Sequence, residues 1–551
     1  MVVLETQHST LNKLARKLSI EDLEEILFNL GFEIDSSDGD NLKIDITTER
    51  PDLLSTQGLA RAIRAYLGMN NKNYEAKKSD YIVNVKDAAK EWPYAIACVV
   101  KNLDFDDEKI KEVIRIQEKL SATFLRNRRK GGLGLYPLEK IKFPVIYTSD
   151  DPKKIKYRPL EYPDILNGEE ILEKHPTGKI YKHIVQGWKN FPIFKDANNI
   201  IMSMPPILNS HDAGKIDENT KEVFVEATGT DLKTINIAFN VLVGALIDMG
   251  GEAYSVDIKY KDKTLTIPEF REEHRTIEVK KINSVIGIEL KPEDIKKLLE
   301  RMMYGVEKVE KDKLSIIVPS TRSDIWHDID VIDDIARAYG FNNFETRIKH
   351  VESAGETTKS VKLKEELSKI LIGMGYQEAF TLMLTSRQDQ FDKMNIQELK
   401  HIKLGKSVES GVNIIRCWLL PEIIKALQHN RSVEYPHKLF EINYAVIPDE
   451  KIDVKCKDIL KLCIASCHYN ANFTEMKQVL DNIMDVLGIN YEINDADHGS
   501  FIHGRAGKIS VNKKDVAFIG ELHPAVLKNW GLEMPAAALE INLTDLFNLS
   551  D

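Results

Sequence analysis

Four aspartates near residue 330 have a spacing that suits metal binding. Asp330, Asp333 and Asp334 stand three and four residues apart, so they share one face of any helix that contains them. Asp324 lies six residues upstream of Asp330, where we expect a strand to end. Carboxylate oxygens are the ligands that a hard cation such as Mg²⁺ prefers. The same pattern is typical of a solvated acidic face that complements a helix dipole, so the spacing alone leaves both interpretations open.

Cysteine and histidine give a weaker signal. Cys463 and Cys467 are separated by three residues and His468 follows them, but a zinc site needs a second pair of ligands, and Cys456 alone is a poor one. The segment ILKLCIASC instead predicts a strand with buried thiols. The chain has five cysteines, thinly spread, which is not the pattern of a secreted disulfide scaffold.

The common catalytic loops are missing from the sequence. It contains no GxSxG elbow, no GxxxxGK[ST] loop and no GxGxxG turn. A basic run at Arg126, Arg128, Arg129 and Lys130 could contact nucleic-acid phosphates. A charged helix end is the commoner explanation of such a run. Spacing alone therefore identifies no catalytic apparatus.

Composition narrows the class of protein. The chain has 551 residues, which suggests about three or four domains. It is 43% hydrophobic and 29% charged, and its net charge of −10 comes from 86 acidic and 76 basic side chains that are interleaved. This balance argues against a protein that coats nucleic acid. No apolar run reaches the roughly 18 residues of a membrane span, and the first residues lack a signal-peptide pattern. We expect a cytoplasmic protein with no membrane contact.

Hydrophobic periodicity predicts four domains, at residues 1–75, 81–262, 268–346 and 355–551. The first contains a helix between the cap Ser19 and Gly31, with apolar residues at helical spacing. The second mixes strands with helices at 110–124 and 235–249. The third alternates strands with helices at 292–303 and 331–339. The last carries many short strands, which predict a large, mostly antiparallel sheet flanked by helices. The expected fold class is multidomain α/β (α+β).

Several stretches in a fixed order resemble one known family. They are ERPDLLSTQGLARAIRAYLG, HPTGKIYKHI, PPILNS, ATGTD, VPSTRSDIWHDIDVIDDIARAYGFNNF, MGYQEAFTLMLTSR, NANFTEMKQVLDNIMDVLG, HGSFIHGRAGKISVN and IGELHPAVLKNWGLEMP. Together they are similar to the β subunit of the archaeal and eukaryotic-type phenylalanyl-tRNA synthetase. The resemblance covers nearly the whole chain, and its specificity lies in the ordered combination of motifs.

The resemblance implies a role for each domain. Residues 1–75 form an N-terminal α/β domain and residues 81–262 an editing-type domain that binds and proofreads tRNA. Residues 268–346 carry the acid cluster, and residues 355–551 form a class II synthetase-like core. The family works as an α₂β₂ heterotetramer that attaches phenylalanine to tRNA(Phe), and its α subunit binds ATP and phenylalanine.

The resemblance also implies a metal set. The family's magnesium pattern falls on Asp324, Asp330, Asp333 and Asp334, which makes Mg²⁺ the expected cofactor. The third position of that pattern is commonly Glu in the family, so Asp333 has one methylene less reach.

The C-terminal core lacks the residues that hold ATP in this class of synthetase. Such a site needs one Arg on a strand to clamp the α-phosphate and a second, on a glycine-rich motif, for the γ-phosphate. The comparable strand, HKLFEIN, has no Arg, and GLEMPAAALEI offers no GxGxGxxR. Without these guanidinium groups nothing binds triphosphate bidentately. We therefore expect this core to associate with α and not to catalyse.

The family's editing pocket maps onto Phe194, Ser203, Glu226 and Thr228. Such pockets hydrolyse tyrosyl-tRNA(Phe), because an apolar synthetic site rejects one added hydroxyl only weakly. Here Glu226 replaces the family's usual Asp. The family segment G-I-H-D-L-D reads GLYPLE at 134–139, without the His and the Asp. Ordinary strand hydrogen bonding is the alternative role for Ser203 and Thr228. We expect editing to be weakened or absent.

The sequence thus favours a phenylalanine–tRNA ligase β subunit that supplies assembly, tRNA contacts, a Mg²⁺ site and weakened editing. Two alternatives stay open at this stage. One is a free-standing hydrolase of mischarged tRNA, and the other is a binding or scaffold protein built from the same domains.

Overall fold

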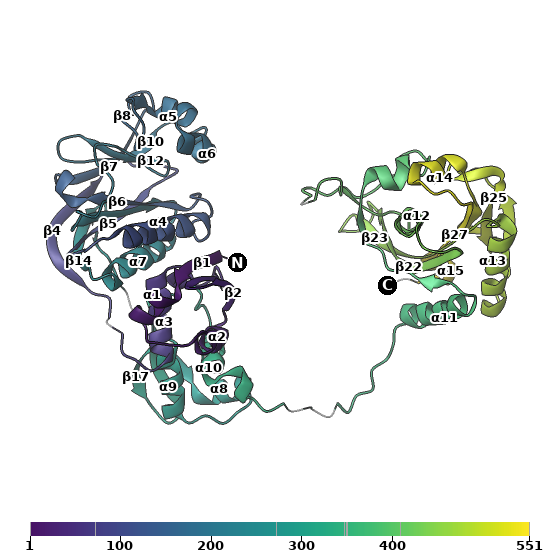
Figure 1. Cartoon of the computed structure of the whole chain (residues 1–551), viewed down its shortest axis with the longest axis horizontal. Coiled ribbons are helices and arrows are strands. Elements are labelled where there is room, and N and C mark those ends of the chain that lie inside the picture. Colours follow the sequence, from purple (N-terminus) through teal and green to yellow (C-terminus); the bar gives the residue numbers. More distant parts are fainter. Residues whose placement is uncertain are drawn as a thin grey trace. The chain divides into compact units, whose positions relative to one another are not determined.

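The computed structural model describes residues 2–71, 73–270, 273–346, 348, 351–407 and 409–549. The chain divides into two compact units, Met1–Arg347 and Ile348–Asp551 (Figure 1). Both units mix helices with sheets, so the predicted multidomain α/β class is confirmed. Within the described ranges, no helix is long and apolar enough to cross a membrane.

The first part of unit 1 is a small sheet of order β1-β3-β2 with three helices. Ser19 caps the second helix in the predicted capping box with Asp22, and Gly31 ends it with a φ of 88°. This positive φ is why a glycine stands there. The elements are β1 (Val2–Gln7), α1 (His8–Leu14), α2 (Ile20–Leu30), β2 (Glu33–Asp38), β3 (Asn41–Ile46), η1 (Pro51–Leu53) and α3 (Thr56–Tyr66).

The second part of unit 1 is built on a ten-stranded sheet. Its order is β12-β11-β10-β7-β4-β14-β5-β13-β6, and β15 pairs with β14. The strands are β4 (Ala76–Val85), β5 (Tyr94–Lys101), β6 (Gly131–Pro137), β7 (Val145–Asp150), β10 (Phe191–Lys195), β11 (Ile201–Met204), β12 (Leu208–Asn209), β13 (Val223–Gly229), β14 (Glu252–Lys259) and β15 (Thr264–Ile267).

Helices cover this sheet where the apolar runs predict them. α4 (Asp107–Ala122) and α7 (Leu232–Asp248) pack against each other and against β6, and α7 also covers β5 and β13 (Figure 1). All seven residues of β13 are buried. The shorter elements are η2 (Leu138–Lys140), β8 (Lys156–Tyr157), β9 (Leu166–Asn167), α5 (Gly168–Lys174) and α6 (Pro176–Val185).

The third part of unit 1 carries the acid cluster. Its sheet has the order β16-β18-β17, and α10 packs against α2 of the first part as well as against α8 and α9. The elements are β16 (Glu273–Glu278), α8 (Val279–Ile286), α9 (Pro292–Arg301), β17 (Gly305–Val309), β18 (Lys313–Val318), α10 (Asp328–Tyr339) and η3 (Phe341–Asn343).

Unit 2 is a seven-stranded sheet of order β19-β22-β23-β27-β26-β25-β24. Every pairing is antiparallel except β19 with β22, which confirms the predicted sheet. The strands of this sheet are β19 (Gln377–Glu378), β22 (His437–Pro448), β23 (Cys456–Cys467), β24 (Glu492–Asp495), β25 (Phe501–Val511), β26 (Lys514–Leu522) and β27 (Ala536–Asn542). A separate two-stranded sheet pairs β20 (Leu384–Thr385) with β21 (Ile414–Ile415).

Helices flank this second sheet, and its thiols are buried as predicted. They are α11 (Lys359–Gly373), α12 (Leu420–His429), α13 (Phe473–Leu487), α14 (Pro524–Trp530) and α15 (Leu543–Phe547), with a π-helical turn η4 at Gln388–Asp392. Cys463 and Cys467 are buried in β23, and burial raises the pKa of the Cys467 thiol to about 11. These cysteines therefore behave as apolar core residues.

Candidate functional site

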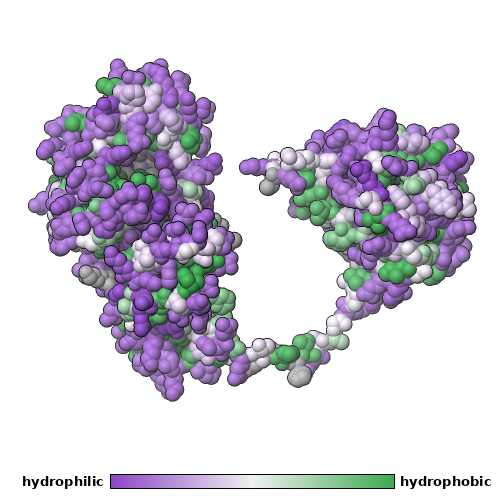
Figure 2. All heavy atoms as spheres, viewed as in Figure 1, coloured by the Kyte–Doolittle hydropathy of each residue, from purple (hydrophilic) through white to green (hydrophobic). Residues whose placement is uncertain are grey.

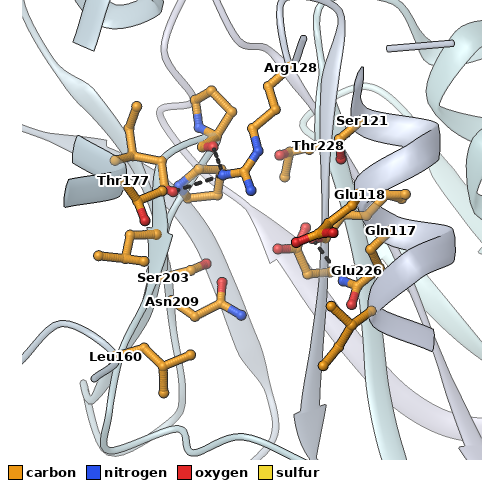
Figure 3. A pocket seen from close by; sticks show the side chains of 17 residues that line it. Gln117, Glu118, Ser121, Arg128, Leu160, Thr177, Ser203, Asn209, Glu226 and Thr228 are labelled. Carbon is orange, nitrogen blue, oxygen red and sulfur yellow. Dashed lines mark hydrogen bonds between the residues drawn. The ribbon is translucent and has the colours of Figure 1, made fainter. Parts of the chain in front are cut away.

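A cavity of about 230 Å³ lies in unit 1 between α4 and strands of the large sheet. Ser203 and Asn209 stand on one side of it, and Glu226 and Thr228 stand on the other (Figure 3). α4 adds Gln117 and other polar side chains to the second side. The cavity thus gathers three of the four residues that the sequence assigns to an editing pocket.

The register of β13 and β6 makes room for the polar side chains. Glu226 pairs with Gly134, and Thr228 pairs with Gly132. Directly paired residues project from the same face of a sheet, so a glycine at each position leaves space beside the larger partner. A Cβ at Gly134 would lie 2.4 Å from Glu226 Oε1. The glycine at position 134 therefore leaves the space that the Glu226 side chain occupies.

Three polar atoms of the pocket are buried without a hydrogen bond. They are Ser203 Oγ, Thr228 Oγ1 and Glu226 Oε2, on residues that are 1%, 0% and 3% exposed. A buried polar group without a partner costs about 1–3 kcal/mol. Ordinary strand hydrogen bonding by the two hydroxyls, the alternative role, does not occur. The three atoms are arranged to meet a polar ligand.

The Glu226 carboxyl is held at one oxygen only. Tyr136 Oη lies 3.2 Å from Glu226 Oε1, and 3.1 Å from Asn209 Oδ1. Burial raises the pKa of Glu226 to about 8, and the hydrogen bond with Tyr136 works against this rise. Glu226 is therefore mostly neutral near pH 7.

Arg128, which belongs to the basic run, stabilises one wall of the pocket. Its Nη1 donates to the carbonyl oxygens of Pro206 and Ile207, at 3.1 and 3.0 Å, and its guanidinium stacks 4.2 Å from the Tyr181 ring centroid. These contacts hold the turn between β11 and β12. Arg128 thus orders the wall that carries Ser203.

Phe194 takes a different position from the one expected. It pairs with Ser203 across β10 and β11, but its ring is fully buried against Tyr147 and Phe224. It is not among the residues that line the cavity. Phe194 therefore belongs to the core beside the pocket, where the strand pairing to Ser203 keeps it close to the site.

A larger cavity of about 1,070 Å³ adjoins the pocket. The two cavities share Leu160, Thr177 and Asn209 among their lining residues, so they lie side by side. The larger one also carries His175 and several acidic side chains. A ligand can therefore reach the pocket through it while most of its own bulk stays outside.

The four predicted metal ligands do not come together. Arg322 binds Asp324 through two hydrogen bonds of 2.8 and 2.6 Å and reaches Asp334 at 2.8 Å. Burial opposes the charge on Asp324, but hydrogen bonds from Arg322 still hold the pKa of that carboxyl below its usual value. A guanidinium thus occupies the position between these two carboxylates.

The other two carboxylates have separate partners. Asp330 accepts hydrogen bonds from the backbone of Trp326 and His327 at the start of α10, and Asp333 pairs with Arg337 at 2.8 Å. In the part of the chain that the structure describes, no group of three or more His, Cys, Asp or Glu side chains could hold a metal ion. In this arrangement the four aspartates do not fit a Mg²⁺ ion.

A buried ion pair lies within unit 2. Arg416 and Glu441 form an ion pair of 3.0 Å with both side chains buried, and Arg416 Nε donates to the carbonyl of Tyr444. Leu439 stands on the same strand as Glu441, where a phosphate-binding Arg is absent. The Arg416 guanidinium is thus committed inside the protein.

Sequence reasoning gave four residues at or beside the pocket no role in it. They are Tyr136, Asn209, Arg128 and Gly134, which lie in stretches named for other reasons, and each acquires its role from strand pairing or a long-range hydrogen bond. One signal was available in β13, because two polar residues interrupt an otherwise apolar strand. Such an interruption in a buried strand suggests a site on that strand.

Family profiles match three stretches of the chain. The Phe-tRNA synthetase beta subunit B1 domain matches residues 2–69, and the tRNA synthetase B5 domain matches residues 275–341. The phenylalanyl tRNA synthetase beta chain CLM domain matches residues 345–543. The acid cluster lies within the second match, and the unit 2 sheet within the third.

Curated relatives and one solved structure cover most of the chain. The phenylalanine–tRNA ligase beta subunit of Pyrococcus abyssi is 38% identical over 97% of both chains, and that of Methanocella arvoryzae is 35% identical over 96% and 97%. A crystal structure of an N-terminal fragment of the Pyrococcus horikoshii phenylalanyl-tRNA synthetase beta subunit covers 62% of this chain and 100% of the fragment. Its identity is 35% and its TM-score is 0.59. The chain belongs to the phenylalanine–tRNA ligase beta-subunit family.

Proposed function

We propose that this chain assembles with an α subunit into a phenylalanine–tRNA ligase and removes tyrosine from wrongly charged tRNA(Phe) in the pocket of unit 1. The observation that carries the second part is the set of three buried, unpartnered polar atoms on Ser203, Thr228 and Glu226. An enclosed, adjoining space allows an aminoacyl group to enter while the nucleic acid stays outside.

The three unpartnered atoms account for the choice of substrate. A phenylalanyl side chain would leave all three without partners, whereas the hydroxyl of a tyrosyl side chain can hydrogen-bond to them. A site built for a hydroxyl rejects the analogue without one strongly, because its buried polar groups then stay unpaired. The pocket is therefore suited to remove tyrosine and to spare the correct product.

The pocket also accounts for a slow reaction. No His or Cys is among its lining residues, and the Glu226 carboxyl, which is mostly neutral near pH 7 because burial raises its pKa to about 8, is assigned to the tyrosyl hydroxyl and not to the ester. The pocket therefore holds no histidine base beside the ester, and general base catalysis contributes typically 10²–10⁴-fold. We expect a hydrolysis that is weaker than that of a pocket with a histidine.

The hydrolysis test uses this chain coexpressed with its α subunit, in the absence of ATP so that no tRNA is charged again. Tyrosyl-tRNA(Phe) and phenylalanyl-tRNA(Phe) are each incubated with the complex, and loss of the ester is followed. We expect faster loss of tyrosine, abolished by Ser203→Ala. Ser149→Ala, which removes a hydroxyl bonded to the backbone outside the pocket, serves as the control. Equal, uncatalysed rates for both esters would overturn the proposed editing.

Assembly with α is supported by an exposed apolar segment in unit 2. Phe380 and Leu382 are 86% and 76% exposed, and Leu384 is also exposed. They follow β19, the edge strand of the sheet, and hydrophobic side chains interrupt the hydrophilic surface of this unit (Figure 2). Exposed apolar patches of this kind mark protein interfaces.

A division of labour between the subunits follows from the core of unit 2. We propose that this core is class II-like but non-catalytic, since the buried Arg416–Glu441 pair leaves that guanidinium unable to bind triphosphate. ATP, phenylalanine and the Mg²⁺ that accompanies ATP then bind to α in an α₂β₂ complex in the cytoplasm. The domains at 1–75, 81–262, 268–346 and 355–551 keep the roles that the resemblance implies.

The two alternative functions predict a different outcome of one assay. Phenylalanylation of tRNA(Phe) is measured for each chain alone and for the mixture. We expect activity only in the mixture. A scaffold protein or a free-standing hydrolase would not associate with α, and α would then be active alone or not at all. The close similarity to β subunits over nearly the whole chain disfavours both alternatives.

A further inference from the structure

The hydroxyl of Tyr136 joins the two walls of the pocket. It lies 3.1 Å from Asn209 Oδ1 on β12 and 3.2 Å from Glu226 Oε1 on β13. The Tyr136 ring is fully buried and packs against Phe224, so the hydroxyl has a fixed position. Tyr136 itself is not among the lining residues, so it meets the pocket through Asn209 and Glu226.

The Tyr136 hydroxyl has a single proton, and this limits the hydrogen bonds that it can donate. A phenol has one proton to donate, and it accepts through its lone pairs. Burial raises the pKa of Tyr136 well above its usual value, so the proton stays on. Tyr136 can donate to Asn209 or to an ionised Glu226, but not fully to both. With Asn209 Oδ1 facing Tyr136, as in the structure, a protonated Glu226 satisfies both contacts, because Oε1 then donates to Tyr136 and Tyr136 donates to Asn209.

We propose that Tyr136 is a positioning residue that draws the Glu226 proton away from the pocket, so that Oε2 faces the substrate as a pure hydrogen-bond acceptor. This inference rests on the proposed editing function. A lone acceptor in a buried site selects a ligand group that can donate, which a phenolic hydroxyl can and a phenyl ring cannot. Tyr136 thereby sets the preference for tyrosine over phenylalanine without touching either.

The surroundings of Glu226 contain few other groups that could control its proton. Tyr147 on β7 is buried, and burial raises its pKa well above the usual value. Glu118 of α4 lies at the pocket wall, and Arg128 is committed to the carbonyls of Pro206 and Ile207. Glu226 Oε2 has no partner of its own. Among the described residues, the Glu226 carboxyl has its hydrogen bond with Tyr136.

The test compares Tyr136→Phe with the unchanged complex of this chain and its α subunit. The substitution removes one oxygen and keeps the ring. We expect the preference for tyrosyl- over phenylalanyl-tRNA(Phe) to fall roughly tenfold, the effect of one misplaced hydrogen bond. The loss should appear mainly in KM for the tyrosyl ester. Tyr260→Phe, which removes a hydroxyl bonded to the backbone of Ala95, is the matched control.

A double-mutant cycle distinguishes an effect of Tyr136 through Glu226 from a general structural effect of Tyr136→Phe. If Tyr136 acts through Glu226, then Tyr136→Phe should change nothing further in a Glu226→Gln background. A merely structural role would slow both esters equally and would add to the effect of Glu226→Gln. Hydrolysis that depends on Ser203 and Glu226 but is unaffected by Tyr136→Phe would overturn this inference and leave the editing function intact.

An infrared measurement tests the proton position without any hydrolysis. The carbonyl band of the neutral Glu226 carboxyl is identified by its loss in Glu226→Gln. We expect Tyr136→Phe to shift that band to higher frequency, as a carboxylic acid does when it loses a hydrogen-bond partner. An unshifted band would overturn the inference. Absence of hydrolysis in every variant, together with a shifted band, would overturn the editing function alone.

Discussion

Gly134 stands directly opposite Glu226 in the β6–β13 ladder, and a Cβ on Gly134 would lie 2.4 Å from Glu226 Oε1 and 2.8 Å from the Tyr136 hydroxyl. The backbone of β6 at this position therefore sets where the Glu226 carboxyl lies. A glycine is required here for space and not for its conformational freedom, since no positive φ occurs at Gly134.

The first prediction concerns this glycine. Gly134→Ala should displace the Glu226 carboxyl and break its contact with Tyr136, because overpacking forces side chains out of their positions at a cost of about 1–3 kcal/mol. Hydrolysis of tyrosyl-tRNA(Phe) should be lost and the melting temperature lowered. Gly373→Ala, at the end of α11 where a Cβ meets open space, should leave hydrolysis unchanged and should not lower the melting temperature. Full hydrolysis by Gly134→Ala would contradict the placement of Glu226.

The second prediction concerns pH and stability. The pKa of Glu226 is raised to about 8 by burial, so the folded state binds one more proton than the unfolded state between about pH 4.5 and pH 8. The contribution of this group to stability is complete below that range and is lost as pH rises through it. The loss amounts to roughly 3–5 kcal/mol.

The measurement is the free energy of unfolding of unit 1, obtained from urea unfolding of the full-length chain at several pH values in this range. Unfolding is followed by the fluorescence of a probe within unit 1. Glu226→Gln, which cannot ionise, should flatten the slope that Glu226 produces. Other groups titrate equally in both proteins, so the difference between the two curves isolates Glu226. Parallel curves would show that the carboxyl has an ordinary pKa in the folded protein.

The third prediction concerns Arg322. Arg322→Met leaves the half-buried carboxylate of Asp324 and the buried carboxylate of Asp334 without their shared cation, and breaking a buried pair costs about 3–5 kcal/mol. The melting temperature should fall strongly. Lys281→Met removes the partly exposed partner of Asp328, which is on the same helix, α10, as Asp334, and should cost under about 1 kcal/mol.

The same variant tests the metal interpretation. Because a guanidinium lies between Asp324 and Asp334, neither Mg²⁺ nor a chelator should change the melting temperature of the unmodified chain. Mg²⁺ should partly restore the stability of Arg322→Met, since a cation can then enter between the two carboxylates. The melting temperature of the unmodified chain could instead rise with Mg²⁺, and Asp330→Asn could remove that rise. This outcome would contradict our view and favour the metal set that the resemblance implies.

The fourth prediction concerns the exposed segment after β19. The double substitution of Phe380 and Leu382 by Asp should prevent association with α, because charges placed in an apolar interface must be desolvated on binding. Copurification and phenylalanylation of tRNA(Phe) should both fail, while the melting temperature of the isolated chain stays the same. Val454→Asp, at another highly exposed apolar residue of unit 2, is the control. Normal assembly of the double variant would place the α-binding surface elsewhere.

Local patterns in the sequence were sufficient to predict many helices and strands. The helix between Ser19 and Gly31 follows from its cap and its apolar spacing, and the strands of unit 2 follow from short alternating runs such as Leu439–Ile447, which lies within β22. The ordered motifs also identified the family. Each of these signals depends on neighbours within a few residues, so the chain itself carries all of the information.

Tertiary structure alone decided the chemistry of the two candidate sites. Tyr136 reaches Asn209 across 73 residues and Glu226 across 90 residues, and Arg322 instead of a metal joins Asp324 to Asp334. The spacing of the aspartates predicted a shared helix face, but it could not predict which cation would meet them. Side-chain partners depend on strand register and on packing between distant elements, and those are set by the whole fold and not by local periodicity.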